Sequence, residues 1–248
     1  MSSRPRIVIG NWKMNLGPES GRALIAKFVE LAPSGVDVVF CVPAPLIAPV
    51  SGQGVEIGAQ DVFWADSGAF TGFVSPALLV EMGVRTVLIG HSERRGRFGK
   101  VEVPPTTLPF FGETDETVNL KLKACARHGL RAVVCVGETL EERQAGKTDS
   151  VIREQVAQAL EGVTGFDGLF AYEPVWAIGT GEVCGAEEAA RVCAMIAKAS
   201  GTRVLYGGSV SPKNAAELFA REEIAGGLVG GASLKAEDFV AVVRAAVM

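Results

Sequence analysis

One carboxylate stands at the end of an apolar run, in a setting that suits a general base. The segment 170–181 reads Phe-Ala-Tyr-Glu-Pro-Val-Trp-Ala-Ile-Gly-Thr-Gly, so Glu173 precedes a stiff Pro-Val-Trp and a glycine-rich tip. Proline fixes φ and glycine frees it, which confines movement to short hinges around a preformed tip. This layout predicts a base on a rigid edge beside a hinged lid. An isolated Glu-Pro pair would more simply indicate a strand followed by a surface loop.

A lysine and an asparagine follow the first strand-like run of the sequence. Asn11 and Lys13 are two residues apart, so strand periodicity points both side chains to the same side. A lysine in that place is a fixed cation that suits an anionic ligand. A lysine paired with a structural carboxylate is the alternative interpretation.

The chain contains two histidines, and one of them leaves a strand-like run directly. His91 is followed by Ser92, a good helix N-cap, and by Glu93 in the expected first turn. The positive end of a helix disfavours an imidazolium, so a neutral ring could donate a hydrogen bond to a carbonyl oxygen. A structural role for His91 is the alternative. His128 lies in a helical pattern just before Gly129, where a solvated or capping histidine is expected.

Two glycine pairs follow the last two strand-like runs. The segments 206–210 and 228–233 each contain Gly-Gly followed by small residues, which lets backbone N–H groups approach an anion. Loops after strands seven and eight form a frequent phosphate site in α/β barrels. The string from Gly179 to Gly185 has one residue too many for a dinucleotide fingerprint, and no spacing suggests a metal. We therefore expect a phosphate ligand, no nucleotide cofactor and no metal.

Short β-rich runs alternate with helical patterns along the whole chain. Runs such as 87–89 and 132–136 do not alternate with polar residues, which is typical of parallel strands covered on both faces. Eight β-then-α units favour an α/β fold with one closed (β/α)8 barrel over residues 1–248, whose strand carboxyl ends carry the chemistry. A doubly wound open sheet is the competitor. We expect strands to begin near Arg6, Asp37, Val55, Thr86, Arg131, Leu169, Arg203 and Ala225.

Composition narrows the class of protein further. The chain has 248 residues, is 48% hydrophobic and 21% charged, and carries a net charge of −4. This balance offers no basic nucleic-acid surface, and the short cluster at 94–97 is expected to be solvated or ion-paired. Five cysteines without a paired pattern suit a reducing compartment, and Cys41 and Cys135 are expected to be packed thiols. With no signal-peptide core and no apolar run long enough for a membrane span, we expect a cytoplasmic protein.

Together these segments resemble the triosephosphate isomerase family. The matching motifs stand in family order and span nearly the whole chain: residues 11–15, 59–61, 68–72, 89–95, 171–181, 206–210 and 228–234. The resemblance implies a TIM barrel and the cofactor-free interconversion of dihydroxyacetone phosphate and D-glyceraldehyde 3-phosphate through an enediolate. That reaction belongs to glycolysis and gluconeogenesis. The family also implies a homodimer formed through the third loop.

The resemblance also implies a role for each matching residue. Glu173 would be the base, His91 the neutral electrophile, Lys13 the cation and Asn11 a supporting hydrogen-bond partner. Phosphate contacts would come from Gly179, Ser209, Gly230 and Gly231. The lid and its apolar clamp would comprise Pro174, Val175, Trp176, Ala177, Ile178 and Leu228, with Ser92 and Glu93 as supports behind the reacting groups.

Three features depart from the family pattern. A proline-rich apolar insertion occupies about 99–111, Phe73 replaces a glutamate in the third loop, and the lid ends in Glu182-Val183-Cys184 where a basic residue is common. We expect Phe73 and the inserted Val103, Leu108, Phe110 and Phe111 to form a new apolar contact that remodels or replaces the usual dimer salt bridge. A solvated extra loop is the simpler alternative. The altered hinge is expected to affect lid kinetics and not the chemistry.

Two other functions compete with an active isomerase. The first is a catalytically impaired phosphate-binding barrel that acts as a binding or assembly module, because the insertion displaces the helix behind His91. The second is another phosphate-using barrel enzyme, such as a synthase or epimerase. That enzyme would share the glycine-rich strand ends but would leave the Glu173 lid without an explanation.

Overall fold

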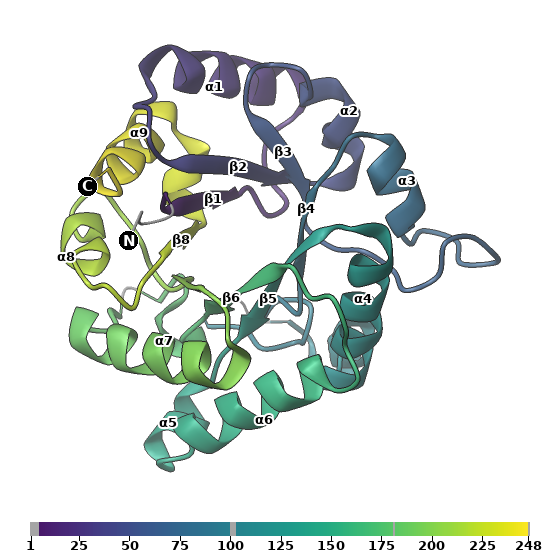
Figure 1. The fold of residues 1–248 in the computed structure, drawn as a ribbon, viewed down its shortest axis with the longest axis vertical. Helices are drawn as coiled ribbons and strands as arrows, with labels where there is room; N and C mark the ends of the chain where they lie inside the picture. Colours follow the sequence, from purple (N-terminus) through teal and green to yellow (C-terminus); the bar gives the residue numbers. More distant parts are fainter. Residues whose placement is uncertain (1–4, 100–102, 181, 248) are drawn as a thin grey trace.

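The chain folds into a closed barrel of eight parallel strands surrounded by helices (Figure 1). The computed structural model describes residues 5–99, 103–180 and 182–247. Each strand pairs with its neighbours in sequence, and β8 closes the ring on β1. The α/β class and the (β/α)8 barrel are therefore confirmed, and the open-sheet alternative is wrong. The strands are β1 Ile7–Asn11, β2 Asp37–Val42, β3 Glu56–Ala59, β4 Thr86–Ile89, β5 Arg131–Val136, β6 Gly168–Tyr172, β7 Val204–Tyr206 and β8 Gly226–Val229.

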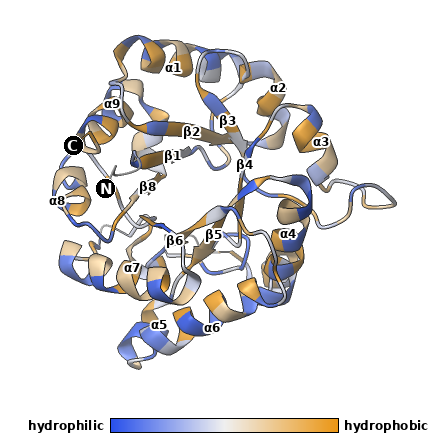
Figure 2. Cartoon of the chain, in the orientation of Figure 1, coloured by the Kyte–Doolittle hydropathy of each residue, from blue (hydrophilic) through white to orange (hydrophobic). Residues whose placement is uncertain are grey.

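Alternate strand residues serve two separate apolar layers. Ile9, Cys41 and Cys135 belong to the inner cluster that fills the barrel, whereas Val8 and Phe40 pack outward against the helices. Because both faces are covered, the strands carry no polar alternation, as their sequences predict. The strands accordingly form the apolar centre in Figure 2, and the packed thiols expected at positions 41 and 135 are confirmed.

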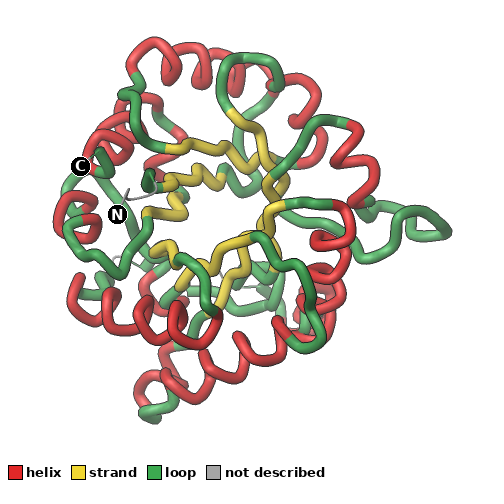
Figure 3. The backbone as a smooth tube through the Cα atoms, in the orientation of Figure 1, coloured by secondary structure: helices red, strands yellow, loops and turns green. Residues whose placement is uncertain are grey.

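The helices lie outside the strands and turn their polar faces to solvent (Figures 2 and 3). α4 shows why these segments are helical: Thr114 caps its first turn and Gly129, with φ of 64°, ends it in the left-handed conformation. Its last residue, His128, places Nε2 2.8 Å from Asp66 Oδ1. The helices are α1 Pro18–Leu31, α2 Ile47–Val50, α3 Pro76–Glu81, α4 Asp115–His128, α5 Leu140–Gln144, α6 Thr148–Leu160, α7 Ala186–Ser200, α8 Ala215–Phe219 and α9 Ala236–Ala245. Short 3-10 helices are η1 Ala44–Leu46, η2 Pro105–Phe111, η3 Val175–Ala177 and η4 Gly231–Leu234.

Two loops expose apolar side chains at the surface. The β3–α3 loop projects beyond the ring of helices beside α3 (Figure 1), and Phe73 in it is 56% exposed. The predicted insertion at 99–111 forms η2 in its second half, while residues 100–102 lie outside the described residues. Phe110 of η2 is 85% exposed.

Candidate active site

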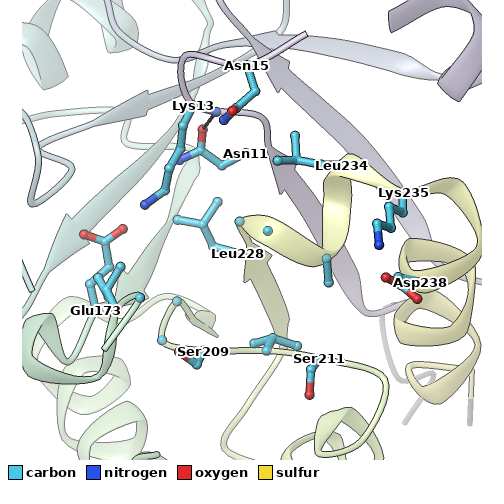
Figure 4. A pocket seen from close by; sticks show the side chains of 18 of the residues that line it. Asn11, Lys13, Asn15, Glu173, Ser209, Ser211, Leu228, Leu234, Lys235 and Asp238 are labelled. Atoms are coloured by element: carbon cyan, nitrogen blue, oxygen red, sulfur yellow. Dashed lines mark hydrogen bonds between the residues drawn. The ribbon is translucent and has the colours of Figure 1, made fainter. Parts of the chain in front are cut away.

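A cavity of about 570 Å³ opens where the strands end, and it gathers most of the residues singled out in the sequence. Figure 4 shows Lys13 and Glu173 extending toward each other on one side, with Ser209 and Leu228 beside them. Strand periodicity and parallel direction account for this meeting, because carboxyl ends of all strands reach the same rim. The predicted residues that line the cavity are Asn11, Lys13, His91, Glu173, Ile178, Gly179, Ser209, Leu228, Gly230 and Gly231.

Glu173 is buried at the end of β6 and faces the first turn after β4. Its Oε2 accepts a hydrogen bond of 3.0 Å from the Ser92 backbone N–H, and the residue is 2% exposed. Its Oε1 lies 3.1 Å from His91 Nε2, but the ring N–H is not aligned with that oxygen. One carboxylate oxygen is therefore held by the protein, while the other is buried without a hydrogen-bond partner among the described residues.

A hydrogen bond to Nδ1, the ring nitrogen that faces away from Glu173, sets the tautomer of His91. The Glu93 backbone N–H donates to His91 Nδ1 over 3.2 Å, so Nδ1 acts as an acceptor and carries no proton. The neutral imidazole then carries its proton on Nε2, which faces the cavity side and Glu173. His91 is 6% exposed. The ring therefore has the correct tautomer to donate to a carbonyl oxygen.

Lys13 brings the cation to the same side of the cavity. Its Nζ lies 2.5 Å from Glu93 Oε1, so the ammonium is ion-paired and still lines the cavity. The Lys13 backbone adopts φ of 50°, a left-handed conformation uncommon for a residue with a Cβ. Asn11 Oδ1 accepts from Lys13 N over 3.0 Å, and Gln60 Nε2 donates to Lys13 O over 2.9 Å. These contacts hold the strained turn that aims the ammonium inward.

Glycine-rich turns form the opposite wall of the cavity. A Cβ on Gly208 would lie 2.3 Å from the Tyr206 hydroxyl oxygen, so only glycine fits there, whereas a Cβ on Gly231 would meet nothing within 4 Å. Ser209 Oγ donates to the Ala177 carbonyl over 2.5 Å, which ties this turn to the lid. The wall also contains Lys235 and Asp238, which lie across the cavity from Glu173 in Figure 4.

The lid follows Glu173 as the short helix η3 and is supported by a buried carboxylate. Glu138 is fully buried, and its Oε1 accepts from Trp176 Nε1 over 2.9 Å and from the Tyr172 hydroxyl over 3.1 Å. The Arg143 guanidinium lies over the Trp176 ring at 4.5 Å. Burial raises the pKa of Glu138 from its ordinary value. The contacts with Glu138 and Arg143 therefore hold Pro174 to Ala177 in place, while Ile178 and Gly179 line the cavity.

The trailing end of the lid is anchored by a buried cysteine. Cys184 is 1% exposed, and burial raises the pKa of its thiol to about 11. Thr180 Oγ1 donates to Trp176 O over 2.8 Å and accepts from Glu182 N over 3.1 Å. The departure Glu182-Val183-Cys184 thus places an apolar anchor, and not a basic side chain, after the lid tip.

Several functional neighbours were missed from the sequence. Glu138 follows β5 as an acidic residue at a strand end, the same signal that singled out Glu173. Gln60 follows β3 in a polar segment, and Lys235 opens α9 beside the glycine-rich turn. Their side-chain directions depend on tertiary packing, which no local spacing reveals. The insertion does not displace His91, since the ring lies 3.1 Å from Glu173. This geometry therefore gives no support to an impaired barrel.

The fold and the site define a class: a (β/α)8 barrel enzyme that combines a carboxylate, an imidazole and a cation beside glycine-rich turns. In the described parts of the chain, no cluster of three or more His, Cys, Asp or Glu side chains could hold a metal ion. None of the helices described is both long and apolar enough to cross a membrane.

Comparison with known proteins identifies the family. Residues 6–246 match the family model for triosephosphate isomerase. A triosephosphate isomerase of Moorella thermoacetica is 46% identical, over 97% of this chain and 98% of the relative. Others from Synechococcus sp. (strain JA-3-3Ab) and Carboxydothermus hydrogenoformans are both 42% identical, over 97% and 98% of this chain and 95% and 100% of the relatives. The chain belongs to the triosephosphate isomerase family, so the predicted family and isomerase class are confirmed.

Proposed function

We propose that this enzyme interconverts dihydroxyacetone phosphate and D-glyceraldehyde 3-phosphate, with Glu173 as the base. One observation carries the proposal. Glu173 Oε1 and His91 Nε2 lie 3.1 Å apart, and both residues line the same cavity as Lys13 and the glycine-rich wall. A proton next to a carbonyl group is weakly acidic. The site therefore needs a base for the carbon-bound proton and donors for the oxygen that becomes negative.

Glu173 removes the proton from one carbon and returns it to the neighbouring carbon. In the arrangement described, Oε2 accepts from the Ser92 N–H, so this oxygen reaches a substrate carbon only after the carboxylate turns away from Ser92. Burial keeps water from competing with the substrate for the carboxylate. We therefore expect Glu173 and the lid to move together in one step.

His91 and Lys13 stabilise the enediolate. The Nε2–H of neutral His91 donates to the developing oxyanion and exchanges a proton between the two oxygens, because a neutral ring can both give and take a proton. Lys13 supplies a positive charge on the same side, with Asn11 and Glu93 fixing its position.

The glycine-rich wall binds the substrate phosphate. Gly230, Gly231 and Gly179 offer backbone N–H groups at positions without a side chain in the way. Ser209 adds a hydroxyl, which must turn from the Ala177 carbonyl to donate to the phosphate. Ile178 and Leu228 close over Glu173 as an apolar clamp when the lid moves. Exclusion of water strengthens the oxyanion contacts and protects the enediolate from loss of phosphate.

A coupled assay with glyceraldehyde 3-phosphate tests this proposal. The unmodified enzyme should turn over without added cofactor, and Glu173→Gln should lower kcat by about 10²–10⁴-fold because the base is lost. Glu182→Gln is the matched control, since it changes an exposed carboxylate on the same loop and should leave kcat unchanged. No turnover by the unmodified enzyme, or equal turnover by Glu173→Gln, contradicts the proposal.

We further propose a cytoplasmic homodimer formed through the β3–α3 loop. Phe73 packs on Phe63 within its own loop at 4.5 Å between ring centroids, which presents an aromatic tip while leaving Phe73 56% exposed. The inserted helix η2 carries Phe110 and Leu108, which are also exposed. Exposed apolar loops of this kind favour a covering partner, and a second copy offers the same surfaces. The buried free thiols are compatible with a reducing compartment.

Sedimentation velocity tests the assembly. Phe73→Glu and a variant lacking residues 99–111 should each sediment as a smaller species than the unmodified chain. Val29→Glu, at an exposed apolar position on α1, is the control and should leave the assembly unchanged. Unchanged assembly of both test variants contradicts the role of these loops.

A further inference from the structure

The lid rests against the first residue of this chain's own insertion. A Cβ added to Gly99 would lie 2.3 Å from the carbonyl oxygen of Ile178, far closer than side-chain carbons approach. It would also lie 2.8 Å from Val175 O and 3.2 Å from Thr180 Cγ2. Both ends of the lid tip therefore contact the position where residue 99 has no side chain.

The backbone of Gly99 does not itself require glycine. Gly99 does not have a positive φ, and the residue is exposed. An alanine would therefore fit the backbone and the surface, and its cost would come from the contact with the lid. The requirement for glycine at this position is set by a neighbouring loop.

The residues before Gly99 are held firmly, so the insertion cannot simply move aside. Arg97 forms hydrogen bonds to both carboxylate oxygens of Glu142 and to Gly137 O. Phe98 packs edge-on against Phe111 at 5.1 Å between ring centroids. A side chain at position 99 must therefore displace the lid.

The contact is made in the lid position that the structure shows, in which Ser92 holds Glu173, and we define this as the resting position. Glu173 immediately precedes the lid, and its Oε2 is still bound to the Ser92 N–H, which it must leave to reach a substrate carbon. We propose that Gly99 is a positioning residue. Because it has no side chain, the resting lid can pack against the insertion, and this contact sets the equilibrium between the resting and the closed lid. This proposal rests on the lid role proposed above.

Steady-state kinetics of Gly99→Ala test the proposal. The added methyl group disfavours the resting lid relative to the closed lid, so a larger fraction of the enzyme is ready for substrate. The KM for glyceraldehyde 3-phosphate should fall by about threefold to tenfold, and kcat should fall less or stay constant. The Kd of 2-phosphoglycolate, which carries the charges of the enediolate phosphate, should fall in parallel.

Two glycine-to-alanine variants serve as controls. Gly112→Ala adds a Cβ at the other end of the insertion, where its one neighbour within 4 Å is Pro109 O, and Gly17→Ala adds one that meets only Ser20 Oγ at 4.0 Å. Both should keep the unmodified KM. A KM of Gly99→Ala that is unchanged, or that rises, overturns the proposal. Because that variant must still turn over, this outcome differs from failure of the proposed reaction, which abolishes turnover in every variant.

A measurement on the unmodified enzyme keeps the proposal testable if Gly99→Ala folds poorly. Saturating 2-phosphoglycolate should draw the lid away from residue 99 and speed amide hydrogen exchange in a peptide that covers 97–99. The peptide covering 34–37, in the connection between α1 and β2 and away from the cavity, should not change. Unchanged or slower exchange at 97–99 contradicts the seating of the resting lid on Gly99.

Discussion

The two halves of the segment between β4 and α4 differ sharply in how they are held. Residues 90–97 form a closely bonded turn: Arg94 N donates to His91 O, Arg97 N to Ser92 O and Arg95 Nε to Gly90 O. Residues 104–110 are exposed throughout, and their one internal side-chain hydrogen bond joins Thr107 Oγ1 to Pro104 O. The first half, which contains His91, is fixed by these hydrogen bonds, and the inserted half is supported mainly at its ends.

This difference explains how the chain accommodates an insertion beside His91. Glu113 N donates to Arg94 O over 3.3 Å, and a Cβ on Gly96 would lie 3.4 Å from Phe111 Cβ. The inserted segment therefore leaves and returns at nearly the same place. Extra residues in a surface loop with fixed ends cost little free energy, and they leave the preceding turn undisturbed.

The largest effect should come from the half that contains His91. His91→Gln replaces an imidazole that can give and take a proton with an amide that cannot, so kcat should fall by about 10²–10³-fold while the protein stays folded. Coupled-assay kinetics with circular dichroism check this. A kcat within a factor of three of the unmodified enzyme would show that the bonded turn does not carry the chemistry.

A smaller effect is expected where the two halves meet. Arg97→Ala removes the bonds to Glu142 and Gly137 O, and it should lower the free energy of unfolding by about 1–2 kcal/mol. Thr107→Ala, in the exposed half, should change it by less than about 0.5 kcal/mol. Urea denaturation of the two variants measures the contrast, and equal losses would remove the distinction between the halves.

The support beneath the lid should show a pH dependence. Burial raises the pKa of Glu138, so the folded state binds its proton more tightly than the unfolded state does. The resulting stability is fully present below the ordinary value of 4.5 and is lost as pH rises through the raised pKa of the folded state. Relative to Glu138→Gln, the unmodified enzyme should therefore lose free energy of unfolding as pH rises. Urea titrations from pH 4 to 8 that gave a constant difference would contradict this.

The smallest effect is expected at the tip of the insertion. Phe110 is 85% exposed, so Phe110→Ser removes little buried surface and should leave kcat and the free energy of unfolding of each protomer nearly unchanged. Thermal unfolding and the coupled assay check both quantities. A loss of kcat comparable with that of His91→Gln would mean that the insertion takes part in the reaction.

The sequence was informative where periodicity and strand ends decide the structure. The apolar runs predicted each strand start to within one residue, and parallel direction brought Glu173, His91 and Lys13 to one rim. Contacts between loops were not predictable, because they depend on tertiary packing. The hydrogen bond from Ser92 N to Glu173, the burial of Glu138 beneath Trp176 and the seat of the lid on Gly99 all belong to this class.

The neutral state of His91 is the claim on which the mechanism depends most, and nitrogen-15 NMR of the imidazole rings tests it directly. With two histidines in the chain, His128→Asn leaves the signals of His91 alone. The account predicts a proton on Nε2 and none on Nδ1 at neutral pH, because Nδ1 accepts from the Glu93 N–H. Signals of a doubly protonated ring, or of a proton on Nδ1, would contradict it.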